Sequence, residues 1–204
     1  MPIKSLSQSS LLSFQKYSSL LAGNTAYSPG SYDLLVTQIL TSSAASVTFT
    51  GLDSYTDYKH LQVRFTGRSD STTASYAVLA FYVNGDTVNT NFQAVHYLYG
   101  NGSSAASAAS TTNRAYGQIP YGLTRDGLTA NSYGAGIIDI LDFSNTNKNT
   151  TFRCFSGITS SALNYVSLTS NLYGVTDAIT ELQFITNNNL MAGSRFSIYG
   201  LKAA

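Results

Sequence analysis

From residue 32 onward, apolar and polar residues alternate one by one, and this two-residue period is the strongest constraint on the fold. In residues 59–66, for example, Leu61, Val63 and Phe65 are separated by single polar residues. Successive side chains of a β-strand point to opposite faces of a sheet, so this pattern predicts strands with one buried face. Residues 76–84 are more continuously apolar, as expected of a strand that is buried on both faces.

The same signals predict about nine or ten strands, joined by short turns that imply antiparallel pairing. The expected strands are residues 33–41, 46–52, 59–66, 76–84, 91–99, 136–143, 151–158, 161–173, 178–186 and 194–201. Residues 100–133 interrupt the pattern with Gly, Ser, Ala and scattered Tyr, and they predict a long functional or mobile loop. The sequence therefore predicts an all-β fold, either a sandwich or a barrel.

Residues 1–33 differ from the rest and predict an N-terminal docking arm with a short helix. Ser9 and Ser10 suit its N-cap, and Gly23 suits its end. A helix this short is marginally stable alone, so we expect its apolar face to dock on a partner or on its own β-domain, residues 34–204. The apolar residues expected to dock are Leu11, Phe14, Tyr17, Leu21 and Tyr27.

The low charge of the chain favours assembly and disfavours nucleic acid as a partner. Charged residues make up 10% of the sequence and the formal net charge is +1, whereas an ordinary soluble domain has roughly 25% charged residues. Weak repulsion between copies suits a protein that packs into an assembly. Phosphates are bound by clusters of Lys and Arg. The nearest approach to one, Lys59, Arg64 and Arg68, is interpreted as solvated positions along one strand and its exit.

No cleavable leader and no membrane-spanning run of apolar residues is apparent in the sequence. We therefore expect synthesis in the cytoplasm of a host cell and no membrane insertion. The single cysteine, Cys154, excludes an internal disulfide and is interpreted as a small, buried or half-buried filler.

Catalytic and metal-binding patterns are not found in the sequence. His60 and His96 have no third ligand at metal-site spacing, and no Gly-x-Ser-x-Gly motif occurs. Asp139 and Asp142 could form a carboxylate pair, but their odd spacing predicts opposite faces of a strand. Asp139 is instead expected to hydrogen-bond to a neighbouring strand or subunit. We expect no enzymatic activity, no catalytic residue, no metal and no cofactor.

Tyrosines are frequent around the predicted loop and form a candidate glycan- or protein-binding region. A tyrosine offers a flat apolar face and a hydroxyl group at low entropic cost. The alternative is that these side chains close the ends of the domain or line a subunit interface. The residues concerned are Tyr97, Tyr99, Tyr116, Tyr121 and Tyr133.

Three parts of the chain resemble virion proteins of tailed bacteriophages, notably phages of cyanobacteria and other marine bacteria. They are Tyr55 with residues 58–64 (YKHLQVR), residues 138–143 (IDILDF) with Asn147, Lys148 and Arg153, and residues 194–202 (SRFSIYGLK). The resemblance spans about residues 32–202. It implies an antiparallel, jelly-roll-like β-sandwich on the particle surface, commonly part of a homotrimer, and it carries no catalytic residues.

Two virion roles are compatible with this resemblance. The first is a non-enzymatic capsid decoration (cement) protein, attached to the particle through its N-terminal arm. The alternative is a tail-fibre or receptor-binding protein that recognises a host-surface glycan. Decoration is preferred because a long fibre would need a shaft. The expected partners are further copies of the chain, capsid or tail proteins and, in the alternative, the glycan. The expected location is the virion.

Overall fold

The predicted all-β class is confirmed by the computed structural model, which describes residues 31–72, 77–103 and 106–202. These residues form twelve β-strands and one short 3-10 helix. The predicted docking arm, with Leu11, Phe14, Tyr17, Leu21, Tyr27 and the expected helix, lies outside the described residues. The first strand begins at Tyr32, so the predicted boundary at residue 34 falls inside a strand. The described part of the chain contains no helix long and apolar enough to cross a membrane.

The strands follow one another through most of the described chain. They are β1 (Tyr32–Ile39), β2 (Ala44–Phe49), β3 (His60–Ser69), β4 (Ala77–Val83), β5 (Phe92–Gly100), β6 (Ser107–Thr111), β7 (Gly117–Arg125), β8 (Gly134–Ile140), β9 (Thr150–Thr159), β10 (Asn164–Tyr173), β11 (Leu182–Leu190) and β12 (Arg195–Leu201). The 3-10 helix η1 (Leu52–Ser54) lies between β2 and β3.

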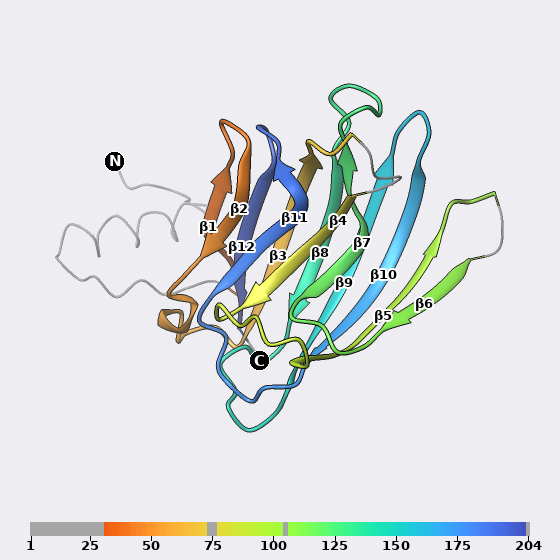
Figure 1. The fold of residues 1–204 in the computed structure, drawn as a ribbon. Coiled ribbons are helices and arrows are strands. Elements are labelled where there is room, and N and C mark those ends of the chain that lie inside the picture. Colours follow the sequence, from red (N-terminus) through yellow and green to blue (C-terminus); the bar gives the residue numbers. More distant parts are fainter. Residues whose placement is uncertain (1–30, 73–76, 104–105, 203–204) are drawn as a thin grey trace, which may run out of the picture. The chain divides into compact units, whose positions relative to one another are not determined.

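The strands form two sheets that face each other (Figure 1). Sheet A has the order β1-β12-β3-β8-β9-β10-β5-β6, and sheet B has the order β2-β11-β4-β7. The pairing is antiparallel, as predicted, except where Arg68 and Ser69 of β3 run parallel to the end of β7. Ser69 also pairs with Leu190 of β11. The end of β3 therefore belongs to both sheets.

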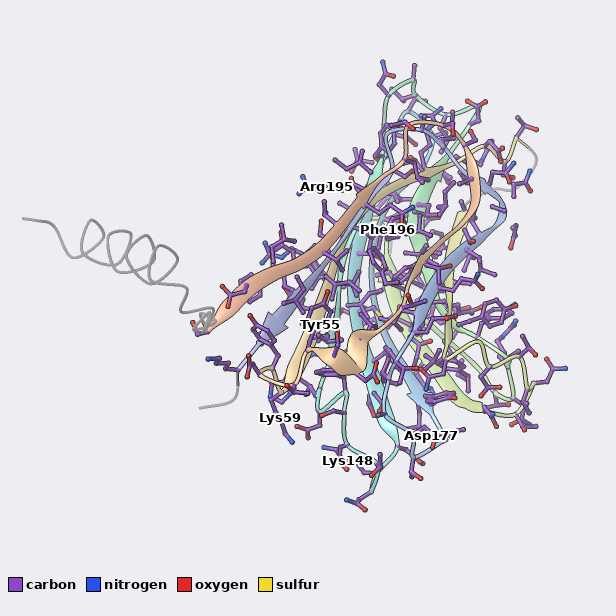
Figure 2. All side chains as sticks on the ribbon, turned by 90° about the vertical axis from the view of Figure 1, so that its left-hand side faces the viewer. Tyr55, Lys59, Lys148, Asp177, Arg195 and Phe196 are labelled. Carbon is purple, nitrogen blue, oxygen red and sulfur yellow. The ribbon has the colours of Figure 1, made fainter. Side chains whose placement is uncertain are left out.

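Phenylalanine rings join the inner faces of the two sheets. The ring centroids of Phe81 in β4 and Phe152 in β9 are 4.9 Å apart, and those of Phe184 in β11 and Phe196 in β12 are 5.1 Å apart. All four side chains are fully buried. Burying one such side chain contributes about 1.5–3 kcal/mol. Adjacent residues of β12 show the alternation, because Phe196 is buried whereas Arg195 is exposed (Figure 2).

Glycines in neighbouring strands leave the space that aromatic rings occupy. A Cβ atom at Gly117 would lie 2.2 Å from the ring of Phe81, and one at Gly136 would lie 2.5 Å from the ring of Phe65. Both distances are far shorter than a van der Waals contact. At these two positions a glycine is therefore required, because any larger residue would occupy the space of the ring.

The prediction that residues 100–133 form one long loop is wrong, because they contain β6 and β7. β7 is almost wholly buried and pairs with β4. Its alternation is interrupted by Pro120 and by Tyr121, whose φ is 57°, and the register with β4 shifts at this point. Such a bulge tolerates a proline, which has no amide hydrogen to donate. β6 consists of Ser, Ala and Thr, so no apolar pattern reveals it.

The interpretation of Arg68 as a solvated residue is also wrong. Arg68 is only 5% exposed. Its guanidinium group donates hydrogen bonds to the carbonyl oxygens of Thr129 (2.8 Å) and Ser132 (3.1 Å) and to the carboxylate of Asp126 (3.1 Å). The position is buried because the end of β3 joins sheet B, which the two-residue period cannot indicate. Arg68 therefore fixes the segment between β7 and β8.

Asp86 fixes the passage of the chain from β4 in sheet B to β5 in sheet A. Its carboxylate accepts hydrogen bonds from the side chain of Asn91, from the backbone amide of Val88 (2.8 Å) and from the hydroxyl of Tyr173 (2.8 Å). Burial raises the pKa of Asp86, but these hydrogen bonds outweigh burial and lower the pKa below its ordinary value of 3.8. The charged form of Asp86 is thus the one that the fold stabilises.

Gly117→Ala should destabilise the domain by about 1–3 kcal/mol, because its methyl group would overlap the ring of Phe81 in the core. The matched control is Gly157→Ala, since a Cβ atom there would lie 3.6 Å from its nearest neighbour, an ordinary contact. Urea unfolding of both variants measures the difference. Equal stability of the two variants would show that the ring of Phe81 is free to move away.

Asp86→Asn should lower the stability of the domain at neutral pH, because a neutral amide is a weaker acceptor than a carboxylate. Since the pKa of Asp86 is lowered in the folded state, its contribution is present above the ordinary value of 3.8 and is lost as the pH falls through the lowered pKa. The thermal midpoints of wild type and variant should therefore converge in acid. Asp57→Asn, at an exposed position, is the control. A gap that persists at the lowest pH would contradict this account.

Candidate functional site

Three of the five predicted tyrosines form one cluster. The ring centroids of Tyr97 and Tyr99 in β5 are 5.8 Å apart, and Tyr121 of β7 lies 4.9 Å from Tyr99. Tyr165 of β10 stacks on Tyr121 with a centroid distance of 4.1 Å and an interplanar angle of 23°. All four side chains are half-buried. We call Tyr97, Tyr99, Tyr121 and Tyr165 the tyrosine cluster.

The other two predicted tyrosines lie apart from this cluster. Tyr116 packs edge to face on Tyr82, with centroids 5.9 Å apart, and accepts a hydrogen bond of 3.0 Å from Arg114. The hydroxyl of Tyr133 donates a hydrogen bond of 2.7 Å to the carbonyl oxygen of Ala192. The interactions of both residues are therefore with other segments of their own domain.

Tyr165 is not among the predicted residues, because it belongs to a strand and the prediction concerned a loop. The signal that could have identified it is its position in the alternation of β10, where it shares a face with the buried Ser167 and Thr169. The partner strand could not have been identified in this way, since the pairing of β10 with β5 joins residues about 70 positions apart.

The tyrosine cluster lies where sheet A extends past the edge of sheet B. Tyr97 and Tyr99 share the inner face of β5 with the buried Val95, whereas the exposed His96 and Leu98 alternate with them. β7 is the last strand of sheet B on this side, and β5 and β6 continue beyond it (Figure 1). The rings therefore lie at the boundary of the area that sheet B covers, where Tyr121 of β7 packs on Tyr99 of β5.

Exposed apolar side chains gather on the opposite, outer face of sheet A. Phe155 of β9, Leu168 of β10 and Leu98 of β5 are direct cross-strand neighbours, and they are 52%, 50% and 46% exposed. Val166, on the same face of β10, is 52% exposed. We call these four residues the apolar patch. Its members come from the consecutive strands β9 and β10 and from β5, which is distant from them in the sequence but adjacent to β10 in the sheet.

This outer face holds most of the exposed apolar surface of the described residues. Nine large apolar or aromatic side chains are exposed among the described residues. Seven of them lie on the outer face of sheet A, namely Tyr32, Leu34, Ile39, Leu98, Phe155, Val166 and Leu168. The other two, Val88 and Leu141, lie in turns. Four of the seven form the contiguous apolar patch, and contiguous exposed patches are typical of interaction sites, whereas single exposed residues are not.

A shallow groove of about 630 Å³ follows β6, β5, β10 and β9 beside the apolar patch. Leu98, Leu168 and Ala108 give it an apolar lining, and His96 and Arg153 contribute polar groups. The groove continues the patch toward the edge of sheet A, so the two form one surface.

At the other side of the outer face, two tyrosines and an arginine pack together. The rings of Tyr32 and Tyr199 stack at 4.9 Å, and the guanidinium carbon of Arg64 lies 5.3 Å from each ring centroid. Tyr32 donates a hydrogen bond of 2.7 Å to the side chain of Gln62. Burial raises the pKa of Tyr32, with smaller opposing and supporting effects of nearby charges, so the hydroxyl remains a donor at neutral pH.

Asp139 connects this group to the centre of the sheet. Its carboxylate accepts hydrogen bonds from Gln62 of β3 (2.8 Å) and from Arg153 of β9 (3.0 Å). The predicted hydrogen bond of Asp139 to a neighbouring strand is confirmed. The ion pair with Arg153 is largely exposed and contributes little to the stability of the domain. These residues therefore mainly make this part of the outer face polar.

The residues considered for catalysis are accounted for by local structure. His60 accepts a hydrogen bond of 2.9 Å through Nδ1 from the backbone amide of Asp142. The carboxylate of Asp142 is paired with Lys148 and Lys59, at one end of the domain (Figure 2), and the hydrogen bond from Lys148 is the main cause of its lowered pKa. His96 is exposed on the outer face of β5.

Cys154 lies in the core, as predicted, and burial raises the pKa of its thiol well above the usual range. A thiol in this state is a poor nucleophile. Among the described residues, no group of three or more His, Cys, Asp or Glu side chains is arranged to hold a metal ion.

Comparison with known proteins assigns neither a family nor a function to the chain. No protein-family model matches the chain, and no curated protein matches it either.

Proposed function

We propose that this chain is a non-enzymatic structural protein of a tailed-bacteriophage particle, a capsid decoration (cement) protein. Copies associate through the outer face of sheet A into a trimer, and residues 1–33 attach the trimer to the shell. The β-domain is a jelly-roll-like sandwich in this proposal. The observation that carries it is the concentration of exposed apolar and aromatic side chains on the outer face of one sheet.

The apolar patch supports association because its side chains expose apolar surface to water, and a second copy could cover this surface. Phe155, Leu168 and Val166 are each about half exposed, and full burial of such a side chain is worth about 1.5–3 kcal/mol relative to full exposure. Covering the patch would therefore recover roughly half of this amount per residue. The net charge of +1 opposes the approach of a second copy only weakly.

The group of Tyr32, Tyr199 and Arg64 supports the same role. Protein interfaces are enriched in tyrosine and arginine, which combine contact area with hydrogen bonding. Gln62 and Asp139 already orient this group through hydrogen bonds. The outer face thus combines an apolar part with an ordered polar part, as interfaces commonly do.

The virion location rests on the resemblance to phage proteins. Its three parts lie mainly in β3, β8 and β12 and in the residues that flank them, and these strands are adjacent in sheet A. The resemblance therefore concentrates on one continuous region of sheet A, whose outer face is the one proposed to assemble. The resemblance also motivates the trimer and the capsid or tail proteins as partners.

The double variant Phe155→Ser/Leu168→Ser should convert the trimer into a monomer, because it removes the centre of the apolar patch. The measurement is the mass in solution by light scattering. The matched control is Val88→Ser/Leu141→Ser, whose side chains are 54% and 51% exposed but lie away from this face. A monomeric wild type, or a double variant that keeps the trimer mass, would contradict the assembly role.

Deleting residues 1–30 should abolish co-sedimentation with the phage shell and leave the trimer intact. The reason is that Leu11, Phe14, Tyr17 and Leu21 recur at helical spacing. They would give the expected helix one apolar face that can dock on the shell. Leu11→Ser/Phe14→Ser in the full chain should have the same effect with less disturbance. Undiminished binding of the deletion variant to shells would exclude the arm as the attachment.

A further inference from the structure

We propose that Asn101 is a site of non-enzymatic modification, at which deamidation converts its side-chain amide to a carboxylate. The sequence holds two Asn–Gly pairs, Asn84–Gly85 and Asn101–Gly102. Asparagine is among the thermolabile residues, and a following glycine favours the reaction because it has no Cβ atom to hinder its backbone nitrogen. The two pairs differ in their surroundings, and only the second is open to the reaction. This site goes beyond the assembly role and does not depend on it.

The reaction needs water and no other reagent. The backbone nitrogen of Gly102 loses its proton to hydroxide and attacks Cγ of Asn101, so that a new N–Cγ bond closes a cyclic imide. The Cγ–Nδ2 bond breaks, and Nδ2 takes a proton from water and leaves as ammonia. Water then adds to one of the two carbonyl carbons of the ring and opens it. The product is an aspartate, or an isoaspartate whose backbone runs through Cγ.

The surroundings of Asn101 favour this reaction. Asn101, Gly102 and Ser103 are all exposed, and a Cβ atom at Gly102 would have no neighbour within 4 Å, so hydroxide reaches the Gly102 amide. Oδ1 of Asn101 accepts hydrogen bonds from the backbone amide (3.1 Å) and from the hydroxyl (3.0 Å) of Ser103. These donors direct the side chain toward the backbone that follows it. They also stabilise the negative charge that develops on Oδ1 when the nitrogen attacks.

Asn84 is held away from the same reaction by the segment between β10 and β11. Its Nδ2 donates a hydrogen bond to the carbonyl oxygen of Ala178 (2.8 Å). Its Oδ1 accepts hydrogen bonds from the backbone amides of Thr180 (2.8 Å) and Glu181 (3.1 Å) and from the Thr180 hydroxyl (3.1 Å). The side chain must give up these bonds before Cγ meets the nitrogen of Gly85. A displacement of about 1 Å from the reactive geometry can slow a reaction about 100-fold.

The new charge would lie beside the apolar patch. Asn101 follows Gly100, the last residue of β5, and Gly100 is opposite Val166 of the patch in β10. β5 and β6 are the last strands at this edge of sheet A (Figure 1). One conversion lowers the formal net charge of the chain from +1 to 0. Copies that have aged in solution therefore carry a charge at this edge that freshly made copies lack.

The experiment incubates the full-length protein at mildly alkaline pH, either folded or unfolded in guanidinium chloride. Conversion is followed by mass spectrometry of chymotryptic peptides. Chymotrypsin cleaves after aromatic residues, so Asn84 and Asn101 fall in separate peptides, since Phe92 and Tyr99 lie between them. In the folded protein Asn101 should be converted about tenfold or more faster than Asn84. In the unfolded chain the two rates should become similar, because the hydrogen bonds that hold Asn84 are lost.

Two variants of the folded protein test the chemistry. Ser103→Ala removes the hydroxyl donor and should slow the conversion of Asn101 by about two- to tenfold. Gly102→Ala should slow it more strongly, because the added Cβ atom hinders the attacking nitrogen. Gly85→Ala is the matched control, since it alters the other Asn–Gly pair and should leave the rate at Asn101 unchanged.

The proposal is overturned if the folded protein shows no conversion of Asn101, or the same rate at Asn101 and Asn84. It is equally overturned if Asn84 remains slow in the unfolded chain, because the difference would then arise from neighbours in the sequence and not from the fold. An unchanged rate in Ser103→Ala would overturn the role assigned to the hydroxyl. None of these outcomes involves the mass in solution, so failure here is distinguishable from failure of the assembly proposal.

Discussion

The contact of phenylalanine rings between the two sheets is the constraint on which the rest of this structure depends. Phe81 alone lies within 5.6 Å of Phe92, 4.9 Å of Phe152 and 6.3 Å of Phe184, measured between ring centroids. Such a junction leaves little freedom for the separation of the sheets, and it explains why glycine faces Phe81 at position 117. Because apolar packing holds the domain, the surface is free to carry few charges.

The two sheets differ in size, so the two faces of sheet A have different surroundings. Sheet B ends at β7, so it covers the inner face of β5 only in part, with Phe81 packed on Phe92 and Tyr121 packed on Tyr99. The tyrosine cluster lies at the boundary of this covered area. The outer face of the same strands bears Leu98, and the adjoining strands add Phe155 and Leu168. Sheet A thus has exposed apolar side chains on its outer face and packed tyrosines near the edge of its inner face.

The sequence predicts those features that depend on local patterns. Ten of the twelve strands follow from alternation and turn residues, and the buried position of Cys154 follows in the same way. β7 is missed because Pro120 and the bulge at Tyr121 break its pattern. Arg68 is misinterpreted because β3 changes sheets, and the apolar patch arises from a strand order that no local signal encodes. Three members of the tyrosine cluster are predicted as candidate residues. Their contact with one another depends on the strand pairing and its register, which the sequence does not reveal.

The pairing of the first and last strands determines how the domain responds to a pulling force. β1 and β12 are antiparallel neighbours, with Tyr32 opposite Leu201, and the amide of Lys202 donates a hydrogen bond to the carbonyl oxygen of Ser31. A force that separates these two points acts across the strands, so it loads the hydrogen bonds of this pair one after another. The edge strand would peel away at low tension, while the central strands stay unloaded. A force that acts on residue 31 and on Arg195, at the opposite end of the strand pair, would instead pull along the strands. All hydrogen bonds between β1 and β12 would then share the load.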